Sequence, residues 1–181
     1  MAPIREPEPV KLILGMLSAF PGTFAAAEQA LVEALGPVDL RSEVTAHEFT
    51  EYYRDEMGHP LARSFLAFAR LIDPGELPEI KRSTNDLERQ IAAGGEWNAP
   101  RPINLDPGYV APAKLVLASC KDYTHRIYLG DGVYAETTLA WINGRWETYR
   151  WTYPDFRTAN YQDFLTQVRA RLMEQRKGGQ K

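Results

Sequence analysis

Residues 114–157 read KLVLASCKDYTHRIYLGDGVYAETTLAWINGRWETYRWTYPDFR. The stretch contains four short runs rich in β-branched and aromatic residues, which are typical of strands. Two turn signals lie between them, Gly130-Asp131-Gly132 and Asn143-Gly144, and Asn-Gly is the strongest signal for a two-residue hairpin loop. We therefore expect an antiparallel β-meander here.

The register of this meander decides which side chains share a face. A three-residue loop at 130–132 separates apolar from polar positions better than a two-residue loop, so we prefer it. The first hairpin then predicts the pairs Leu129–Val133, Ile127–Ala135, Tyr128–Tyr134 and Arg126–Glu136. The Asn-Gly hairpin predicts the pairs Trp141–Trp146, Leu139–Thr148, Thr138–Tyr149 and Glu136–Trp151.

These pairs predict one apolar and one polar–aromatic face. The side chains expected to face inward are Ile127, Leu129, Val133, Ala135, Leu139, Trp141 and Trp146. The side chains expected on the other face are Arg126, Tyr128, Tyr134, Glu136, Thr138, Tyr149 and Trp151.

The sequence before this stretch predicts alternating strands and helices. Residues 10–18 form an apolar run typical of a buried strand. Thr23 is a candidate N-cap for a helix that ends at Gly36-Pro37, and residues 38–50 look extended. Residues 48–60, with Tyr52 and Tyr53, are loop-like. Residues 63–72 fit a strand or a helix, and the break at 73–75 before a clear helix favours the strand.

The second helix shows an apolar stripe at helical spacing, formed by Leu77, Ile80, Thr84, Leu87 and Ile91, and Gly94-Gly95 closes it. Residues 96–112 then read as a proline-rich loop, in which Asp106-Pro107-Gly108 has the composition of a turn that presents Asn104. A last helix is expected at about 158–177, with Tyr161, Phe164, Leu165, Val168 and Leu172 as its apolar stripe.

The order strand, helix, strand, strand, helix, strand predicts an α+β fold with a ferredoxin-like (βαββαβ) core. We expect one domain over residues 1–181. Its core would span about 9–120, extended by the β-meander and the C-terminal helix over about 121–177.

Composition restricts the class of protein. The chain has 181 residues, 44% of them hydrophobic, and a formal net charge of −3, which disfavours nucleic acid as a partner. No apolar run is long enough to span a bilayer, and the N-terminus lacks the apolar core of a signal peptide. The single cysteine, Cys120, reads as a small buried hydrophobe and fits a reducing compartment. We therefore expect a cytoplasmic protein that does not bind membranes.

The polar face of the sheet has two interpretations. In one, Arg126 and Glu136 form an ordinary cross-strand ion pair and the aromatic rings cover the sheet. In the other, the face lines a pocket in which Arg126 binds an anion, Glu136 acts as a base, and the rings of Tyr128, Tyr134 and Trp151 stack on the ligand. Lys121, Asp122 and His125, at the end of these strands, favour the pocket.

Several familiar sites are absent from the sequence. It contains no GxxxxGK[ST] phosphate loop, no GxGxxG and no HExxH pair. No metal site is predicted and any cofactor is unknown, although a hard cation stays an alternative, held by His125 with scattered carboxylates. Those carboxylates are Asp106, Asp122, Glu136 and Asp155.

Several short segments of the sequence resemble those of a bacterial family known as domain of unknown function 4416. These segments are NLDPGY, KLVLAS-x-KD, HRIYL, YAETTL and WTYPDFR, together with PVKLILGMLS, YYRDEMG and IKRSTNDLE. The resemblance spans about residues 9–171. It implies that a shared set of residues recurs, namely Asn104, Asp106, Lys114, Lys121, Asp122, His125, Arg126, Glu136, Asp155 and Arg157. Cys120 stands where the family usually has threonine, and Phe156 where tyrosine is common.

We therefore expect a polar cleft that binds a small anionic ligand, a nucleotide or a phosphorylated metabolite. Lys114, Lys121, Arg126 and Arg157 would contact the anion, with Asn104 beside them. His125, Glu136 and Asp122 are the candidate catalytic residues if the protein is an enzyme. The alternative is an interaction module that binds a protein, or RNA, through an exposed Tyr/Trp face of the sheet.

Overall fold

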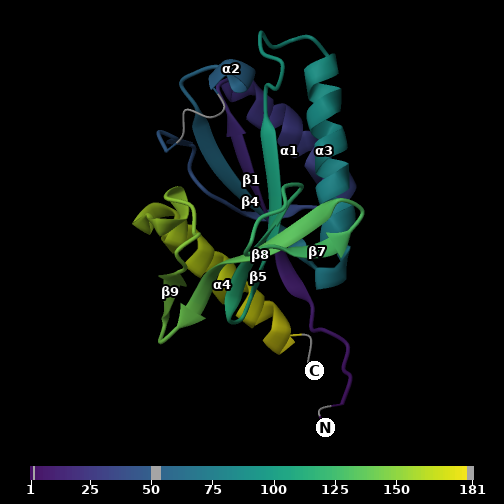
Figure 1. Ribbon diagram of the computed structural model, residues 1–181, viewed down its shortest axis with the longest axis vertical. Helices are drawn as coiled ribbons and strands as arrows, with labels where there is room; N and C mark the ends of the chain where they lie inside the picture. Colours follow the sequence, from purple (N-terminus) through teal and green to yellow (C-terminus); the bar gives the residue numbers. More distant parts are fainter. Residues whose placement is uncertain (2, 50–53, 179–181) are drawn as a thin grey trace.

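Nine antiparallel strands form one sheet in the computed structural model, which describes residues 1, 3–49 and 54–178 (Figure 1). The strand order is β2-β4-β1-β5-β6-β8-β7, with β3 paired to β4 and β9 paired to β8. The strands are β1 Val10–Ser18, β2 Val38–Arg41, β3 Thr45–Ala46, β4 Ala62–Ile72, β5 Asn104–Ala111, β6 Lys114–Ser119, β7 Ile127–Gly130, β8 Val133–Ile142 and β9 Arg145–Thr148.

Four α-helices accompany the sheet in the described part of the chain: α1 Pro21–Leu35, α2 Arg54–Met57, α3 Leu77–Ala93 and α4 Ala159–Gly178. Two short 3₁₀ turns, η1 Pro74–Glu76 and η2 Asp155–Arg157, precede α3 and α4. A mixed α/β protein with a large antiparallel sheet is thus confirmed.

The helices form a layer on each face of the sheet (Figure 1). α1 and α3 bury their apolar side chains against one face of β1, β4 and β5, where Leu14 and Phe68 are fully buried. α4 covers the opposite face, where all five residues of its predicted stripe are buried. Burial of large apolar side chains contributes about 1.5–3 kcal/mol each, so these two layers are the main source of stability.

β1 and β4 are interior strands of the sheet, as their sequences indicate. Every residue of β1 is buried, and β1 pairs with β4 on one side and β5 on the other. β4 runs over Ala62–Ile72, so the strand interpretation of the ambiguous segment 63–72 is confirmed.

The N-terminal part also differs from the sequence-based expectation in two places. Helix α1 starts at Pro21 instead of after Thr23, and the Thr23 hydroxyl donates back to the carbonyl of Phe20 at 2.7 Å. Part of the expected loop 48–60 is the short helix α2. Tyr52 and Tyr53 lie outside the described residues.

The proline-rich segment 96–112 contains a strand, contrary to the prediction of a loop. Asn104–Ala111 forms β5, which lies between β1 and β6. Leu14 pairs with Pro107 and Gly15 with Asp106, so the predicted Asp106-Pro107-Gly108 turn is wrong. The strand that follows the second long helix is therefore β5, and not the strand at Lys114.

A bulge in β8 changes which side chains share a face. Leu115 pairs with Leu139 but Val116 pairs with Thr137, so β8 has one extra residue at this point. Val133 and Ala135 consequently pack with Leu77 on the α3 side, whereas Leu139 packs on the α4 side. The prediction of one continuous inward face is wrong because regular alternation stops at the bulge.

The first hairpin follows the predicted register only in part. Ile127–Ala135 and Tyr128–Tyr134 are paired as expected, but Gly130 instead of Leu129 pairs with Val133. Ile127 is 72% exposed, so its predicted inward position is wrong, and Leu129 is also exposed. β7 lies at the edge of the sheet, where β8 is its neighbour, and the side chains of Ile127 and Leu129 are in contact with solvent there.

The second hairpin is shorter than expected. Leu139–Thr148 and Trp141–Trp146 are paired as predicted, and β9 ends at Thr148. The predicted pairs Thr138–Tyr149 and Glu136–Trp151 are absent from the ladder. The meander is also incomplete, because β6 pairs with β8 instead of with β7.

Candidate functional site

A cleft opens where β5 and β6 separate. The two strands are paired from Gly108–Leu117 to Ala111–Lys114, while residues 104–107 have no partner on β6. Gly108 marks the closest approach, since a Cβ at this position would clash with the carbonyl oxygen of Val116. Beyond Gly108 the gap between the strands is occupied by polar side chains.

Helix α3 replaces the missing strand partner of β5. The N–H of Leu105 donates to Glu88 Oε1 at 2.7 Å, and Lys81 Nζ donates to the Leu105 carbonyl at 2.9 Å. Alternate residues of a strand point their backbone groups to the same side, so Pro107 also faces this gap. Its missing N–H is tolerated here because β6 has already separated from β5.

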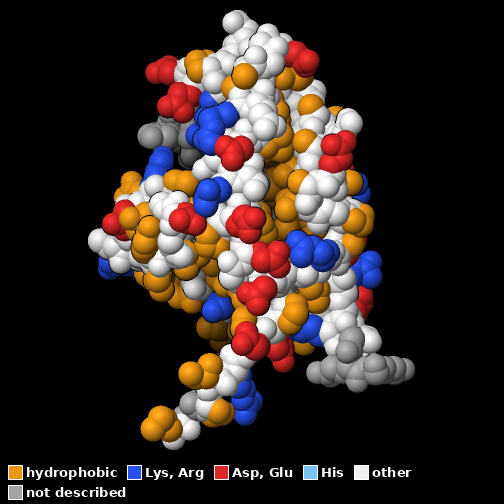
Figure 2. All heavy atoms as spheres, turned by 90° about the vertical axis from the view of Figure 1, so that its right-hand side faces the viewer, with side chains coloured by type: hydrophobic (Ala, Val, Ile, Leu, Met, Phe, Trp, Pro, Cys, Tyr) orange, Lys and Arg blue, Asp and Glu red, His pale blue; other side chains and the backbone are white. Residues whose placement is uncertain are grey.

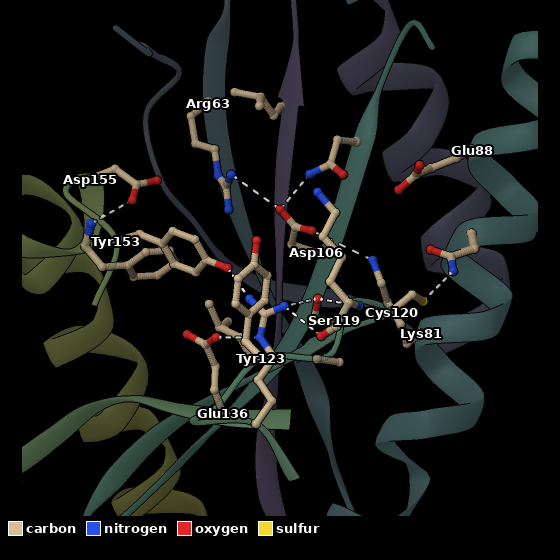
Figure 3. Close-up of a pocket in the computed structure, with 18 of the residues that line it drawn as sticks. Arg63, Lys81, Glu88, Asp106, Ser119, Cys120, Tyr123, Glu136, Tyr153 and Asp155 are labelled. Atoms are coloured by element: carbon tan, nitrogen blue, oxygen red, sulfur yellow. Dashed lines mark hydrogen bonds and ion pairs between the residues drawn. The ribbon is translucent and has the colours of Figure 1, made fainter. Parts of the chain in front are cut away.

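The resulting cleft has a volume of about 830 Å³, within the range typical of small-molecule sites. Figure 3 shows Asp155 and Tyr153 on one side, Glu88 and Lys81 on the α3 side, and Asp106 between them. Six cationic side chains line the cleft, namely Arg63, Lys81, Arg89, Arg101, Lys121 and Arg126. Four carboxylates also line it, namely Glu88, Asp106, Glu136 and Asp155.

Asp106 lies between two cations at the centre of the cleft. Its carboxylate is 3.5 Å from Arg63 Nη1 and 3.7 Å from Lys81 Nζ, and Asn104 donates to it at 2.6 Å. Burial alone would raise the pKa of Asp106, but Lys81, Arg63 and the Asn104 hydrogen bond outweigh it and hold this pKa below its usual value. The group is therefore an ionised carboxylate at neutral pH.

Glu88 stands at the α3 end of the cleft. Arg101 donates to its Oε2 from Nε at 3.0 Å and from Nη2 at 2.8 Å. Burial raises the pKa of Glu88, against the opposing effects of Arg101 and Lys81. Arg101 also donates to Asn104, so this pair is connected to the Asp106 cluster.

A second cluster is centred on Glu136, whose side chain is 1% exposed. Arg126 Nε donates to Glu136 Oε2 at 2.8 Å, and His125 Nε2 lies 3.0 Å from the same oxygen. The Arg126 guanidinium also donates to Ser119 Oγ at 2.9 Å and to Tyr153 Oη at 2.5 Å. The predicted Arg126–Glu136 pair is thus present, as a buried ion pair in a hydrogen-bonded network.

Four rings form a column beside this cluster. Tyr149 and Trp151 stack at 4.8 Å, Trp151 and His125 at 5.2 Å, and His125 and Tyr123 at 6.1 Å. The indole N–H of Trp151 donates to the Thr137 carbonyl at 3.0 Å. The Trp151 ring therefore stacks on two rings of the protein itself, those of Tyr149 and His125.

His47 and Asp155 form a third group in the cleft wall. His47 directly follows β3, and its backbone N–H donates to the Leu61 carbonyl at 2.8 Å. Its Nδ1 lies 3.9 Å from Asp155 Oδ2 and has no hydrogen-bond partner among the residues that the structure describes. Burial lowers the pKa of His47 below its usual value, and the positive charge of Arg63 acts in the same direction.

The structure brings together some of the residues predicted from sequence and separates others. The cleft is lined by Asn104, Lys121, His125, Arg126, Glu136 and Trp151. The residues that do not line it are Lys114, Asp122, Tyr128, Tyr134 and Arg157.

The residues outside the cleft have other positions. Lys114 is exposed at the far end of β6, and Asp122 is exposed on the loop after it. Tyr128 packs against Tyr134 at 5.1 Å on the edge hairpin. Arg157 holds the turn before α4 by donating to the carbonyls of Thr152, Tyr149 and Arg150. Cys120 is exposed and lines the cleft, so the prediction of a buried cysteine is wrong.

Sequence reasoning missed several residues of the cleft, including His47, Lys81, Glu88 and Arg101. One signal was present. Lys81 and Glu88 continue the buried stripe of α3 at positions four residues after Leu77 and Thr84, and charged residues on such a stripe indicate buried polar contacts. His47 and Arg101 lie in irregular segments and gave no signal.

The charges on one face of the molecule are mixed. On the face shown in Figure 2, Lys and Arg side chains lie among Asp and Glu side chains. Within residues 1, 3–49 and 54–178, no group of three or more His, Cys, Asp or Glu side chains has an arrangement that could hold a metal ion. In the same residues, no helix combines the length and apolar character needed to cross a membrane.

Comparison with known proteins supplies a family and no activity. Searches of curated proteins and of solved structures find no match to this chain. The family model described as Domain of unknown function (DUF4416) matches residues 8–172, which include all the strands of the sheet, every residue that lines the cleft, and α4 as far as residue 172. The chain therefore belongs to the DUF4416 family.

Proposed function

We propose that the cleft binds a small oxyanionic ligand of the phosphate type, such as a phosphorylated metabolite or a nucleotide. The observation that carries this proposal is the position of Arg63 and Lys81, two buried cations that share the single carboxylate of Asp106. Their distances to it, 3.5 and 3.7 Å, are longer than the 2.7–2.9 Å that is typical of a charge-assisted hydrogen bond. Both cations thus keep hydrogen-bonding capacity for a ligand.

Arg63 supports the proposal further. It is 6% exposed, and its Nε has no hydrogen-bond partner in the described part of the chain. A buried group that lacks its hydrogen bond costs about 1–3 kcal/mol, and more when it is charged. A bound oxyanion would supply the missing acceptor, and a guanidinium is well suited to a phosphate because it donates in a planar fork.

In this proposal the Glu136 cluster provides acid–base chemistry. Glu136 would orient the His125 ring through the 3.0 Å contact between Glu136 Oε2 and His125 Nε2, in the way that a buried carboxylate fixes the position of a histidine general acid or base. Arg126 neutralises Glu136 and fixes its position. Asp122 has no part in this arrangement, since it lies outside the cleft.

We also propose that the fold of the first half is ferredoxin-like and that the protein acts in the cytoplasm. The neighbouring strands β2, β4, β1 and β5 are antiparallel, and the long helices α1 and α3 precede β2 and β5 along the chain. This order agrees with the split βαβ arrangement. Exposed Cys120, a free thiol, fits a reducing compartment.

Thermal-shift measurements with phosphate, pyrophosphate, sugar phosphates and nucleotides test the proposal. A ligand at about a hundred times its Kd stabilises the protein by about 2.7 kcal/mol, which raises Tm by several degrees. Sodium chloride at equal ionic strength controls for screening. Lys81→Gln should abolish the shift, whereas Lys114→Gln, a matched change outside the cleft, should preserve it. No shift with any of these oxyanions would refute the proposal.

A second candidate function is strand addition by a protein partner at β7. Ile127 and Tyr128, 72% and 59% exposed, lie with exposed Leu129 on this edge strand. Exposed apolar edge strands are the usual template for an added strand. A partner that the unchanged protein captures from cells should no longer be captured by Ile127→Lys, although Tm stays the same. If this variant still captured the same partner, the β7 edge would not be the binding site.

A further inference from the structure

His47, like Arg63, is a buried cleft residue with a polar atom that lacks a hydrogen-bond partner in the described part of the chain, and its hydrogen bonding points to a change on ligand binding. Its ring is 5% exposed, and Nδ1 faces Asp155 Oδ2 at 3.9 Å, beyond hydrogen-bond distance. Asp155 is itself fixed, because its Oδ1 accepts from the backbone N–H of Phe156 at 3.0 Å. In the neutral ring with its proton on Nε2, the lone pair of Nδ1 would face a carboxylate oxygen.

Protonation would change this contact into a favourable one. An imidazolium carries N–H on both ring nitrogens, so Nδ1 would become a donor directed at the Asp155 carboxylate. Two influences oppose protonation of the ring in the free protein, namely its burial and the positive charge of Arg63, and both lower the pKa of His47. Asp155 and Asp106 favour the protonated form. Arg63, Asp155 and Asp106 are thus the charged groups that act on the ring.

We infer that His47 takes up a proton from solvent when an oxyanion binds beside Arg63, which makes His47 a proton-linked part of the anion site. This inference rests on the proposed function. The bound anion would neutralise the charge of Arg63 that opposes protonation, and its own charge would attract the imidazolium. The chain gains one proton at His47, and no covalent bond is formed or broken.

The linkage has a defined sign. Because anion binding raises the pKa of His47, protonation must strengthen anion binding by the same factor. Affinity is therefore highest at low pH and falls as the pH rises through the pKa of His47 in the complex. The ligands favoured by such a site are dianionic or more highly charged oxyanions, which gain most from an added positive charge.

Side-chain NMR of the histidines tests this directly. The chain has three histidines, so three single His→Gln variants assign every imidazole signal. The probe is sodium sulfate, an oxyanion that does not titrate near neutral pH, with sodium chloride at equal ionic strength as the reference. His59, which lies outside the cleft, is the internal control.

The expected result is a rise of about one pH unit in the titration midpoint of His47, equivalent to about tenfold tighter binding of sulfate to the protonated protein. The midpoint of His59 should not move. Arg63→Gln should abolish the shift of His47, and Asp155→Asn should lower its midpoint in the free protein.

The possible failures are distinguishable. Sulfate binding that is detected by backbone amide shifts at the cleft, with the His47 midpoint unchanged, would overturn the proton linkage and leave the anion site intact. An absence of any sulfate-dependent shift at the cleft, at concentrations up to the solubility of the protein in sulfate, would refute both. Equal shifts at His47 and His59 would show general screening, and would also overturn the inference.

Discussion

The guanidinium of Arg63 lies over the backbone of Gly15. Arg63 belongs to β4 and Asp106 to β5, and β1 runs between these two strands, with Gly15 paired to Asp106. The side chain of Arg63 reaches Asp106 across this glycine, and a Cβ at position 15 would come within 2.5 Å of Arg63 Nη2. The missing side chain of Gly15 therefore leaves the space that the Arg63 guanidinium occupies.

Gly15→Ala should weaken oxyanion binding although it removes no charged group. The added methyl group displaces the guanidinium, and loss of one charge-assisted hydrogen bond lowers affinity by about ten- to a hundredfold. Titration with pyrophosphate by calorimetry measures the loss. In an Arg63→Gln background the same change should have little further effect, because the group that it displaces is gone. Additive losses would contradict this role of Gly15.

Glu136→Gln should be strongly destabilising. The change leaves Arg126, whose side chain is 4% exposed, without its counter-charge, and removing one partner of a buried ion pair costs about 3–5 kcal/mol. Urea unfolding measures the difference. Glu147→Gln is the matched control, because its ion pair with Arg145 is largely exposed and such pairs contribute about 1 kcal/mol or less. Similar losses for the two variants would show that the Glu136 network is not buried in solution.

His47 should make the protein less stable in mild acid. Its pKa in the folded protein lies below the ordinary value of 6.5, so the unfolded chain binds more protons between these two values. The free energy of unfolding should therefore decrease as the pH falls from about 7 through 6.5 and towards the lower folded pKa. His47→Gln should flatten this part of the stability profile in urea titrations. An unchanged profile would mean that His47 titrates normally in the fold.

Gly108→Ala should disrupt the point at which β5 and β6 separate. The added Cβ would meet the carbonyl oxygen of Val116 and the backbone of Leu117, which cannot move aside as a flexible side chain would. Overpacking of this kind costs about 1–3 kcal/mol, measured as a lower Tm. Gly178→Ala, where the new Cβ meets nothing within 4 Å, serves as the control and should not lower Tm. A neutral effect of Gly108→Ala would imply that the two strands are not in close contact there.

Local patterns in the sequence predicted most of the regular elements. The apolar run of β1, the stripes of α3 and α4, and the Asn143-Gly144 hairpin each depend on residues close in the chain, and each is present. β5 was missed for an equally local reason. Its Asp-Pro-Gly composition is typical of a turn, and only the gap beside β6 allows proline in this strand.

The sequence by itself determined most of the strands and helices and the proximity of Arg126 to Glu136, because the pattern of a strand or helix and the register of a hairpin both depend on residues close in the chain. The tertiary structure alone decided which residues form the cleft. Arg63, Lys81 and Asp106 come from β4, α3 and β5, and they meet only because β6 separates from β5 at Gly108 while Gly15 leaves room across β1. Such contacts depend on strand divergence and on the absence of a side chain, and neither leaves a periodic signal in the sequence.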